Sequence, residues 1–258
     1  MLKTIFLGLS VSAVGLSLLL PCYAAAPVKI ATVAPVGDLA GQIEASIKLL
    51  DEYLATNETY TQSKKKVRIE ATVVAVLSQA VVESDDKASV AWNAAAADLR
   101  DAARSIGDSK TYDAAKKGLE AVKAAHGGTA AGAKPEHEWN KLAGLGAVMD
   151  AINSRSGKIR NGSRKKADTV TDAELADGSG AASVLAVLAL AVHDDTHEVK
   201  SKKKEDIDQW QKFAKEFQTQ LTATSAAFKK KDMAGAADGW KKGNAACNEC
   251  HAKFREKE

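Results

Sequence analysis

Two cysteines and a histidine stand close together near the end of the chain, in the run Cys247-Asn248-Glu249-Cys250-His251. In a Cys-x-x-Cys-His run, the two thiols add to the vinyl groups of a haem, and the histidine that follows is placed to ligate its iron. The spacing therefore predicts one covalent haem c. Cys247 and Cys250 are its expected attachment points, and His251 is the expected iron ligand.

The same cysteines suit two other uses, a small disulfide or half of a zinc site. Zinc takes four ligands, and the only other cysteine, Cys22, stands near the opposite end of the chain. The remaining histidines show no paired ligand spacing: His126, His137, His193 and His197. Haem attachment is therefore the favoured interpretation, and the disulfide is the alternative.

The start of the chain is apolar and carries one early positive charge. Lys3 precedes an apolar run from Ile5 to Leu20, and Cys22-Tyr23-Ala24 follows as a small-residue exit. The run has about 16 residues, fewer than the roughly 20 that a spanning helix needs. We therefore interpret residues 1–24 as a secretory signal, and we expect a periplasmic mature chain with no membrane span. A lipoprotein signal at Cys22 is the alternative, although Pro21 stands where such signals carry a small residue.

The bulk composition favours helices and argues against a nucleic-acid partner. Ala, Lys, Glu, Leu and Val dominate, and after Pro35 only Pro135 interrupts the chain. The formal net charge is +3, whereas nucleic-acid binding calls for a concentrated basic face with aromatic partners. The basic clusters are instead spread along the chain, at 64–66, 164–166, 202–204 and 229–231. We expect an all-α protein that binds no nucleic acid.

Apolar residues at helical spacing predict four helices in each half of the chain. The first four are expected at 38–54, 67–84, 86–106 and 110–126, with a polar break at 57–66. A Gly- and Ala-rich linker follows at 127–134. The second four are expected at 136–159, 181–192, 205–229 and from Asp232 through the motif, with a polar stretch at 161–180. The expected units are therefore residues 37–128 and 136–258.

The two halves also match each other in sequence. Four matches occur in the same order: 39–41 with 142–144, 73–81 with 184–192 at six of nine positions, Trp92 with Trp210, and 112–126 with 233–247. Duplication is the favoured interpretation, and a chance match of alanine-rich helices is the alternative. Cys247, Cys250 and His251 fall opposite His126, Thr129 and Ala130, so the first unit is expected to be haem-free. Because 73–81 and 184–192 are more apolar than one small core requires, we expect the units to pack through their first and second helices.

The end of the chain, CNECHAKFR, follows a predicted helix that carries Trp210 and closes a set of four helices. In these respects the region from about Glu136 to the C-terminus resembles cytochrome c′ and the wider class II c-type cytochromes. The resemblance implies an up-down four-helix bundle with haem near its C-terminus, and hence two such bundles in tandem. Family members are generally single bundles that often pair as homodimers. We therefore expect either a monomer with an internal pseudo-dimer or a homodimer.

The resemblance also implies roles for individual residues of the motif. Cys247 and Cys250 correspond to the thioether cysteines, and His251 corresponds to the proximal iron ligand. Arg255 matches the family arginine that follows the histidine by one helical turn and lies beside the imidazole and haem edge. A solvated charge in a polar tail is the alternative for Arg255.

The opposite face of the haem comes from the first helix of the bundle in this family. Here that helix offers Leu142, Leu145 and Met149, and Trp139 is expected as a wall of the site or as a core anchor. Apolar leucines leave the iron five-coordinate, whereas a methionine makes it six-coordinate. We expect the apolar arrangement, with Met149 as the alternative sixth ligand, and with His137 less favoured because it lies off the apolar stripe.

The implied function is that of an exported mono-haem cytochrome. Such a protein transfers electrons to a redox partner protein, or binds a small gas such as nitric oxide or carbon monoxide at the iron. A haem peroxidase is one alternative, but it needs acid and base groups over the iron, and the expected distal helix is mostly apolar. A protein-interaction module with a vestigial haem is the other. We therefore do not expect an enzyme.

Overall fold

The computed structural model describes residues 29–255, and this part of the chain is helical without strands. The predicted secretory signal, residues 1–24, lies outside the described residues. The all-α prediction is confirmed. The α-helices are α1 Val36–Tyr53, α2 Asn57–Glu83, α3 Ala96–Asp108, α4 Tyr112–His126, α5 Leu145–Gly162, α6 Asp172–Asp194, α7 Lys204–Lys229 and α8 Met233–Phe254.

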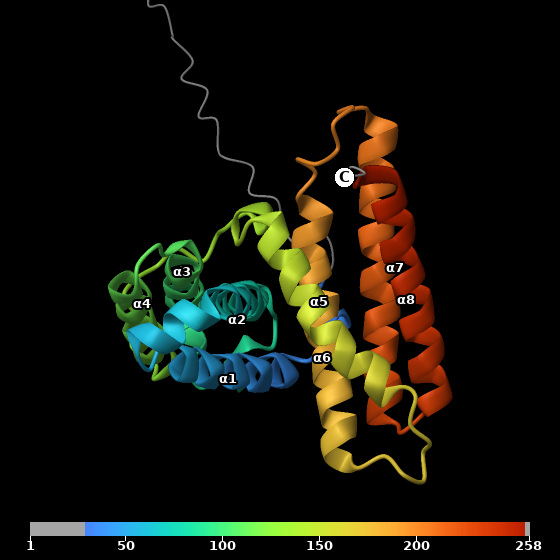
Figure 1. Ribbon diagram of the computed structural model, residues 1–258, viewed down its shortest axis with the longest axis horizontal. Helices are drawn as coiled ribbons and strands as arrows, with labels where there is room; N and C mark the ends of the chain where they lie inside the picture. The colour runs from blue at the N-terminus through green and yellow to red at the C-terminus, as the bar shows by residue number, and fades with distance from the viewer. Residues whose placement is uncertain (1–28, 256–258) are drawn as a thin grey trace, which may run out of the picture.

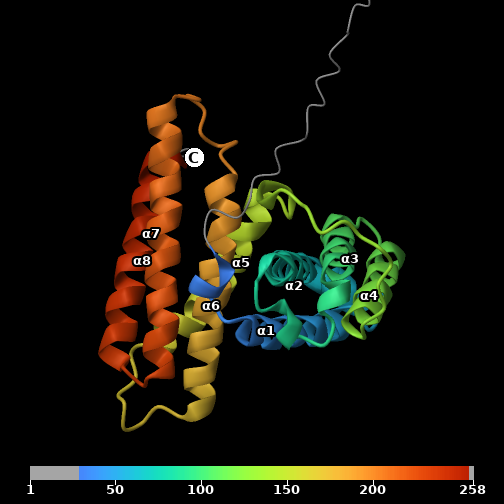
Figure 2. The same ribbon diagram turned by 180° about the vertical axis from the view of Figure 1, so that it is seen from behind.

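These helices form two groups of four, α1 to α4 and α5 to α8 (Figure 1). Within each group every helix packs on the next one, and the first and fourth helices touch each other little. The groups meet where α1 and α2 contact α5 and α6, as Figure 2 shows from behind. The expectation that the units pack through their first and second helices is therefore confirmed. The buried apolar side chains form one continuous cluster across this junction.

Two helices, α2 and α6, supply the centre of that cluster. Their C-terminal halves are apolar on every side, and residues 71–81 and 178–192 are buried throughout. Among the described helices, α6 is the one long and apolar enough to cross a membrane, with a mean hydropathy of 1.8. However, 83% of that window is buried inside the protein, as expected of a core helix. A helix that is apolar all round needs neighbours on all sides, and the junction provides them.

Of the two segments expected to be polar breaks, 57–66 is helical throughout, and 161–180 is helical except at 163–171. Residues 57–66 form the first turns of α2, because the Thr56 hydroxyl accepts a hydrogen bond from the Thr59 N–H, and the Thr59 hydroxyl caps Thr56 in return. Residues 172–180 likewise open α6 behind a capping box of Thr171 and Glu174. Capping satisfies the free N–H groups of a helix start, so polar residues there need only face solvent.

Two predicted helices begin later than expected. The segment 86–95 forms only short 3-10 turns, and α3 starts at Ala96. The segment 136–144 is not α-helical either, because α5 starts at Leu145 behind Gly144. As a result, residues 39–41 lie inside α1 whereas residues 142–144 precede α5. That pair of the internal match is therefore not structurally equivalent.

The linker into α5 is held by Arg100, which is 1% exposed. Its guanidinium donates to the carbonyl oxygens of Lys134 and Pro135, at 2.7 and 2.9 Å, and to Gln79 Oε1 at 2.7 Å. These bonds fix the path of residues 134–135 against α2 and α3. The start of α5 is thereby placed at one end of the second group.

Candidate functional site

The motif lies at the end of α8, beyond the length of its counterpart α4. The internal match aligned Tyr112 with Met233, and these residues begin α4 and α8. α4 ends at His126, the residue matched with Cys247, whereas α8 continues to Phe254. Cys250 and His251 therefore stand on an extension of about two helical turns.

Glycines on α8 bring this helix close to α7. A Cβ atom at Gly239 would lie 2.5 Å from Thr224 Oγ1, and one at Gly243 would lie 2.7 Å from Leu221 Cδ2. Neither position has room for a side chain, so α8 rests directly on α7. On its other side α8 hardly contacts α5. The space between α5 and the end of α8 is therefore free to form a cleft.

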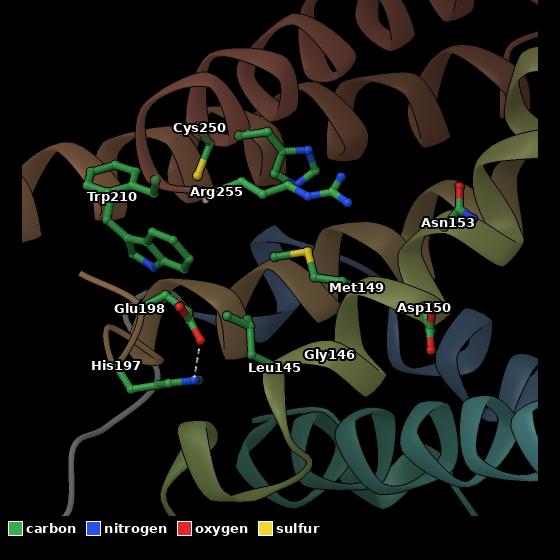
Figure 3. Close-up of a pocket in the computed structure, with 12 residues that line it drawn as sticks. Leu145, Gly146, Met149, Asp150, Asn153, His197, Glu198, Trp210, Cys250 and Arg255 are labelled. Carbon is green, nitrogen blue, oxygen red and sulfur yellow. Dashed lines mark ion pairs between the residues drawn. The ribbon is translucent and has the colours of Figure 1, made fainter. Parts of the chain in front are cut away.

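This cleft has a volume of about 710 Å³, which is within the usual range for cofactor and ligand sites. Its walls come from α5, the end of α8, the start of α7 and the loop that joins α6 to α7 (Figure 3). The lining residues are Leu145, Gly146, Met149, Asp150, Asn153, His197, Glu198, Trp210, Cys250, His251, Phe254 and Arg255.

The chemically active side chains of the motif meet at this cleft. Cys250 and His251 line it, and Cys247 lines an adjoining cavity of about 180 Å³. The two cavities share Met149 as well as Cys250 and His251. Cys247 and Cys250 carry free thiols, so the disulfide alternative is not adopted in this structure.

Burial determines the protonation of the motif. It raises the pKa of the Cys247 thiol to about 12, with a further contribution from Cys250, and that of Cys250 to about 11. His251 is exposed at the surface, yet partial desolvation of its imidazole lowers its pKa, and the nearby positive charge of Arg255 acts in the same direction. The thiols are thus protected from adventitious reaction as thiolates, and His251 is kept as the neutral imidazole that ligates metals.

Three further residues that the sequence singled out line the cleft. Leu145 and Met149, one turn apart on α5, line the wall opposite α8, and Met149 points from α5 towards α8 in Figure 3. Arg255 lines the same cleft beside the end of α8. The rings of Trp210 and Phe254 pack edge to face at a centroid distance of 5.4 Å and close one end of it.

Trp139 and Leu142 are not brought to the cleft. Trp139 is fully buried, and its Nε1 donates to Glu83 Oε2 at 3.2 Å, so it is the core anchor of the two roles expected for it. Leu142, 2% exposed, lines a separate cavity of about 290 Å³ against α2 and α3. Both residues precede α5 and turn towards the first group. Trp139 and Leu142 therefore do not form the haem wall that was expected of them.

The loop between α6 and α7 contributes residues to the cleft that were not expected from the sequence. His197 and Glu198 line the cleft from this loop (Figure 3). A signal was present, because consecutive helices in a bundle run antiparallel, and the residues just before α7 therefore lie beside the end of α8. The charges of Asp150 on α5 and Glu198 also make this side of the cleft more polar than expected.

Comparison of the chain with family models, with curated proteins and with solved structures gives no match. The motif and the geometry of the cleft are therefore the features that bear on function.

Proposed function

We propose that this protein is an exported mono-haem c-type cytochrome, similar to cytochrome c′, that transfers electrons. The observation that carries the proposal is the convergence of Cys247, Cys250 and His251 on two adjoining cavities at the end of the last helix. Haem c bound there supplies one-electron chemistry at its iron. Export through residues 1–24 stays a prediction from the sequence.

The residues around the motif suit this role. The two sulfurs hold the group covalently, and His251 offers a neutral imidazole on the α8 side. Trp210 and Phe254 exclude water from one end of the cleft. Arg255 contributes a fixed positive charge at the edge of the cleft, where the carboxylates of a haem need a partner.

Met149 favours electron transfer over gas binding. The apolar arrangement expected on the opposite face needed Leu142 and Leu145, and Leu142 faces another cavity. Met149 lines both cavities that His251 lines, and a thioether opposite a histidine is the ligand pair of electron-transfer cytochromes. We therefore assign Met149 as the second iron ligand. Binding of nitric oxide or carbon monoxide is the alternative, and Leu145 supports it by keeping part of the wall apolar.

We further propose that the two groups of helices are tandem four-helix bundles that arose by duplication. Their neighbouring helices pack in the same order. The matched apolar runs end at Val81 and Val192, each two residues before the end of its helix, at Glu83 and Asp194. The match of Trp92 with Trp210 is looser than expected, because Trp92 lies before α3 and packs on His126, whereas Trp210 lies inside α7 and packs on Phe254, seven residues beyond the position matched with His126. The first bundle is haem-free because α4 stops where the motif begins.

Covalent attachment is the direct test of this proposal. The protein is matured in a host that attaches haem c, denatured in acid and weighed intact. One haem is expected to remain bound, and Cys250→Ala is expected to lose the double attachment. Glu249→Gln, an exposed change between the two cysteines, is the matched control and keeps the haem. Bound zinc, or a chain that retains no haem, contradicts the proposal.

A further inference from the structure

His197 is held between two carboxylates at the edge of the cleft. Its Nδ1 is hydrogen-bonded to Asp195 Oδ1. Its Nε2 lies 3.0 Å from Glu198 Oε1 (Figure 3). A neutral imidazole has one N–H, so one of the two carboxylates would face a lone pair. An imidazolium donates to both carboxylates. The geometry therefore selects the protonated ring.

The loop around His197 is held in place by further contacts. Lys202 Nζ donates to the His197 carbonyl oxygen at 3.1 Å. The side chain of Asp195 is 10% exposed, so the carboxylate that orients the ring is itself fixed by burial. The position of the ring at the cleft is thus set by the fold.

Charged and titratable groups face this part of the cleft from every neighbouring element. Those that line it are Glu198 on the loop, Asp150 on α5, and His251 and Arg255 on α8. Asp195, Lys200 and Lys202 belong to the same loop as His197, and Asp206 on α7 accepts a hydrogen bond from Ser201 of that loop. Asp150 is already paired with Lys65 and Arg68, Asp206 with Lys253, and Glu198 with Lys200 at 3.4 Å. The Asp195–His197–Glu198 triad changes from one to two net negative charges when its proton leaves.

We propose that His197 is the proton-linked group of the cleft, and that it would take up one proton from water when the haem proposed for the cleft is reduced by one electron from a partner protein. Oxidation returns the electron to the next partner and the proton to water, so charge and atoms balance. This inference rests on the proposed electron-transfer function. Its physical basis is that an added electron makes a nearby cation more favourable, and the coupling is reciprocal.

The pH range of the coupling follows from the surroundings of the ring. The hydrogen bond to Asp195 raises the pKa of His197 above its ordinary value of 6.5, burial opposes this shift, and the charges of Asp195 and Glu198 add to it. Below that raised pKa the ring stays protonated in both oxidation states, and the reduction potential does not vary with pH. Between the pKa of the ring in the oxidised protein and its higher pKa in the reduced protein, the potential falls as pH rises, at most by about 59 mV per pH unit for one electron and one proton. Above both pKa values the ring is neutral in both oxidation states, and the potential is again independent of pH.

The test measures the reduction potential of the haem-loaded protein from about pH 5 to about pH 10. This range includes the pH at which a histidine with a raised pKa titrates. In the wild type the potential is expected to fall within this range. His197→Gln is expected to show no such fall, and a lower potential than the wild type at acidic pH because the positive charge is gone. Glu198→Gln is expected to move the fall to lower pH. His193→Gln, at the end of α6 and outside the lining of the cleft, is the matched control and is expected to behave like the wild type.

A second readout follows His197 directly. Its pKa, measured by NMR titration, is expected to be higher in the reduced than in the oxidised protein. A chain that attaches no haem overturns the proposed function and this inference together. A haem-loaded protein whose potential is independent of pH, or whose pH dependence survives in His197→Gln or disappears in His193→Gln, overturns this inference alone.

Discussion

Met149 is the residue whose replacement separates the two functions of a haem in this cleft. If its sulfur ligates the iron, the wild type is low-spin, and Met149→Leu is expected to abolish the methionine-to-iron charge-transfer band and to open the iron to carbon monoxide. Absorption spectra of both oxidation states, with and without carbon monoxide, measure this. Met233→Leu, a buried methionine at the opposite end of α8, is the control and should leave the spectra unchanged.

A high-spin wild type whose spectrum Met149→Leu does not change would falsify the ligand assignment. Gas binding at a five-coordinate iron would then become the better function, because leucine has no lone pair to offer the metal.

How much of the site could be predicted from the sequence depends on whether each residue is positioned by its own helix or by the packing of other elements. Cys247, Cys250 and His251 are fixed relative to one another by one helix, so their spacing alone was informative. Leu142 was misplaced because it lies just before the first residue of α5, and its direction depends on where that helix starts. His197 belongs to a loop, and only the packing of α7 on α8 brings it to the cleft.

The close contact of α8 with α7 sets the position of the motif. Gly239→Ala places a methyl group 2.5 Å from Thr224 Oγ1 and 3.2 Å from the Gln220 carbonyl oxygen, which belongs to the backbone. We expect a loss of about 1 to 3 kcal/mol in unfolding free energy from overpacking, which outweighs the higher helix propensity of alanine. Urea unfolding followed by circular dichroism measures the change.

The control for this substitution is Gly41→Ala on α1. This glycine is exposed, and a Cβ there meets no atom within 4 Å. Only the propensity term remains, so the variant is expected to be as stable as the wild type or up to about 1 kcal/mol more stable. Equal effects of the two substitutions would mean that the packing of α8 on α7 is looser than described.

Element types were easier to predict than element ends. Apolar periodicity identified the centre of every helix, because burial of one face requires it. The ends of α2 and α6 were missed because Thr56 and Thr171 begin helices whose first turns are polar and exposed. For such turns the cap is informative and the apolar pattern is not.

A buried ion pair joins the two groups of helices. Arg155 Nη2 on α5 lies 2.5 Å from Glu70 Oε2 on α2, and Ser46 on α1 donates to the same oxygen at 2.8 Å. Arg155→Ala leaves the Glu70 carboxylate buried without its cation, and we expect a loss of about 3 to 5 kcal/mol in unfolding free energy. The double variant Arg155→Met/Glu70→Leu removes both charges and is expected to recover most of that loss.

Equilibrium urea unfolding of the single variants Arg155→Met and Glu70→Leu and of the double variant that combines them completes a double-mutant cycle. A double variant as unstable as Arg155→Ala would show that the junction depends on the charges themselves. The apolar excess of α2 and α6 indicated which helices meet, but no pattern in the sequence indicated that Glu70 and Arg155 would face each other across the junction.

The two-turn extension that carries the motif is also the last described element to be synthesised. Chains grow at about 5 to 20 residues per second, so α1 to α4 are complete roughly 3 to 14 seconds before the end of α6. During that interval the faces of α1 and α2 that later meet α5 and α6 have no partner, and exposed apolar surface of this kind promotes aggregation. In a newly made chain, the junction faces of α1 and α2 are therefore exposed until α5 and α6 follow. Cys247 and Cys250 are synthesised later still, when the rest of the fold can already form around them.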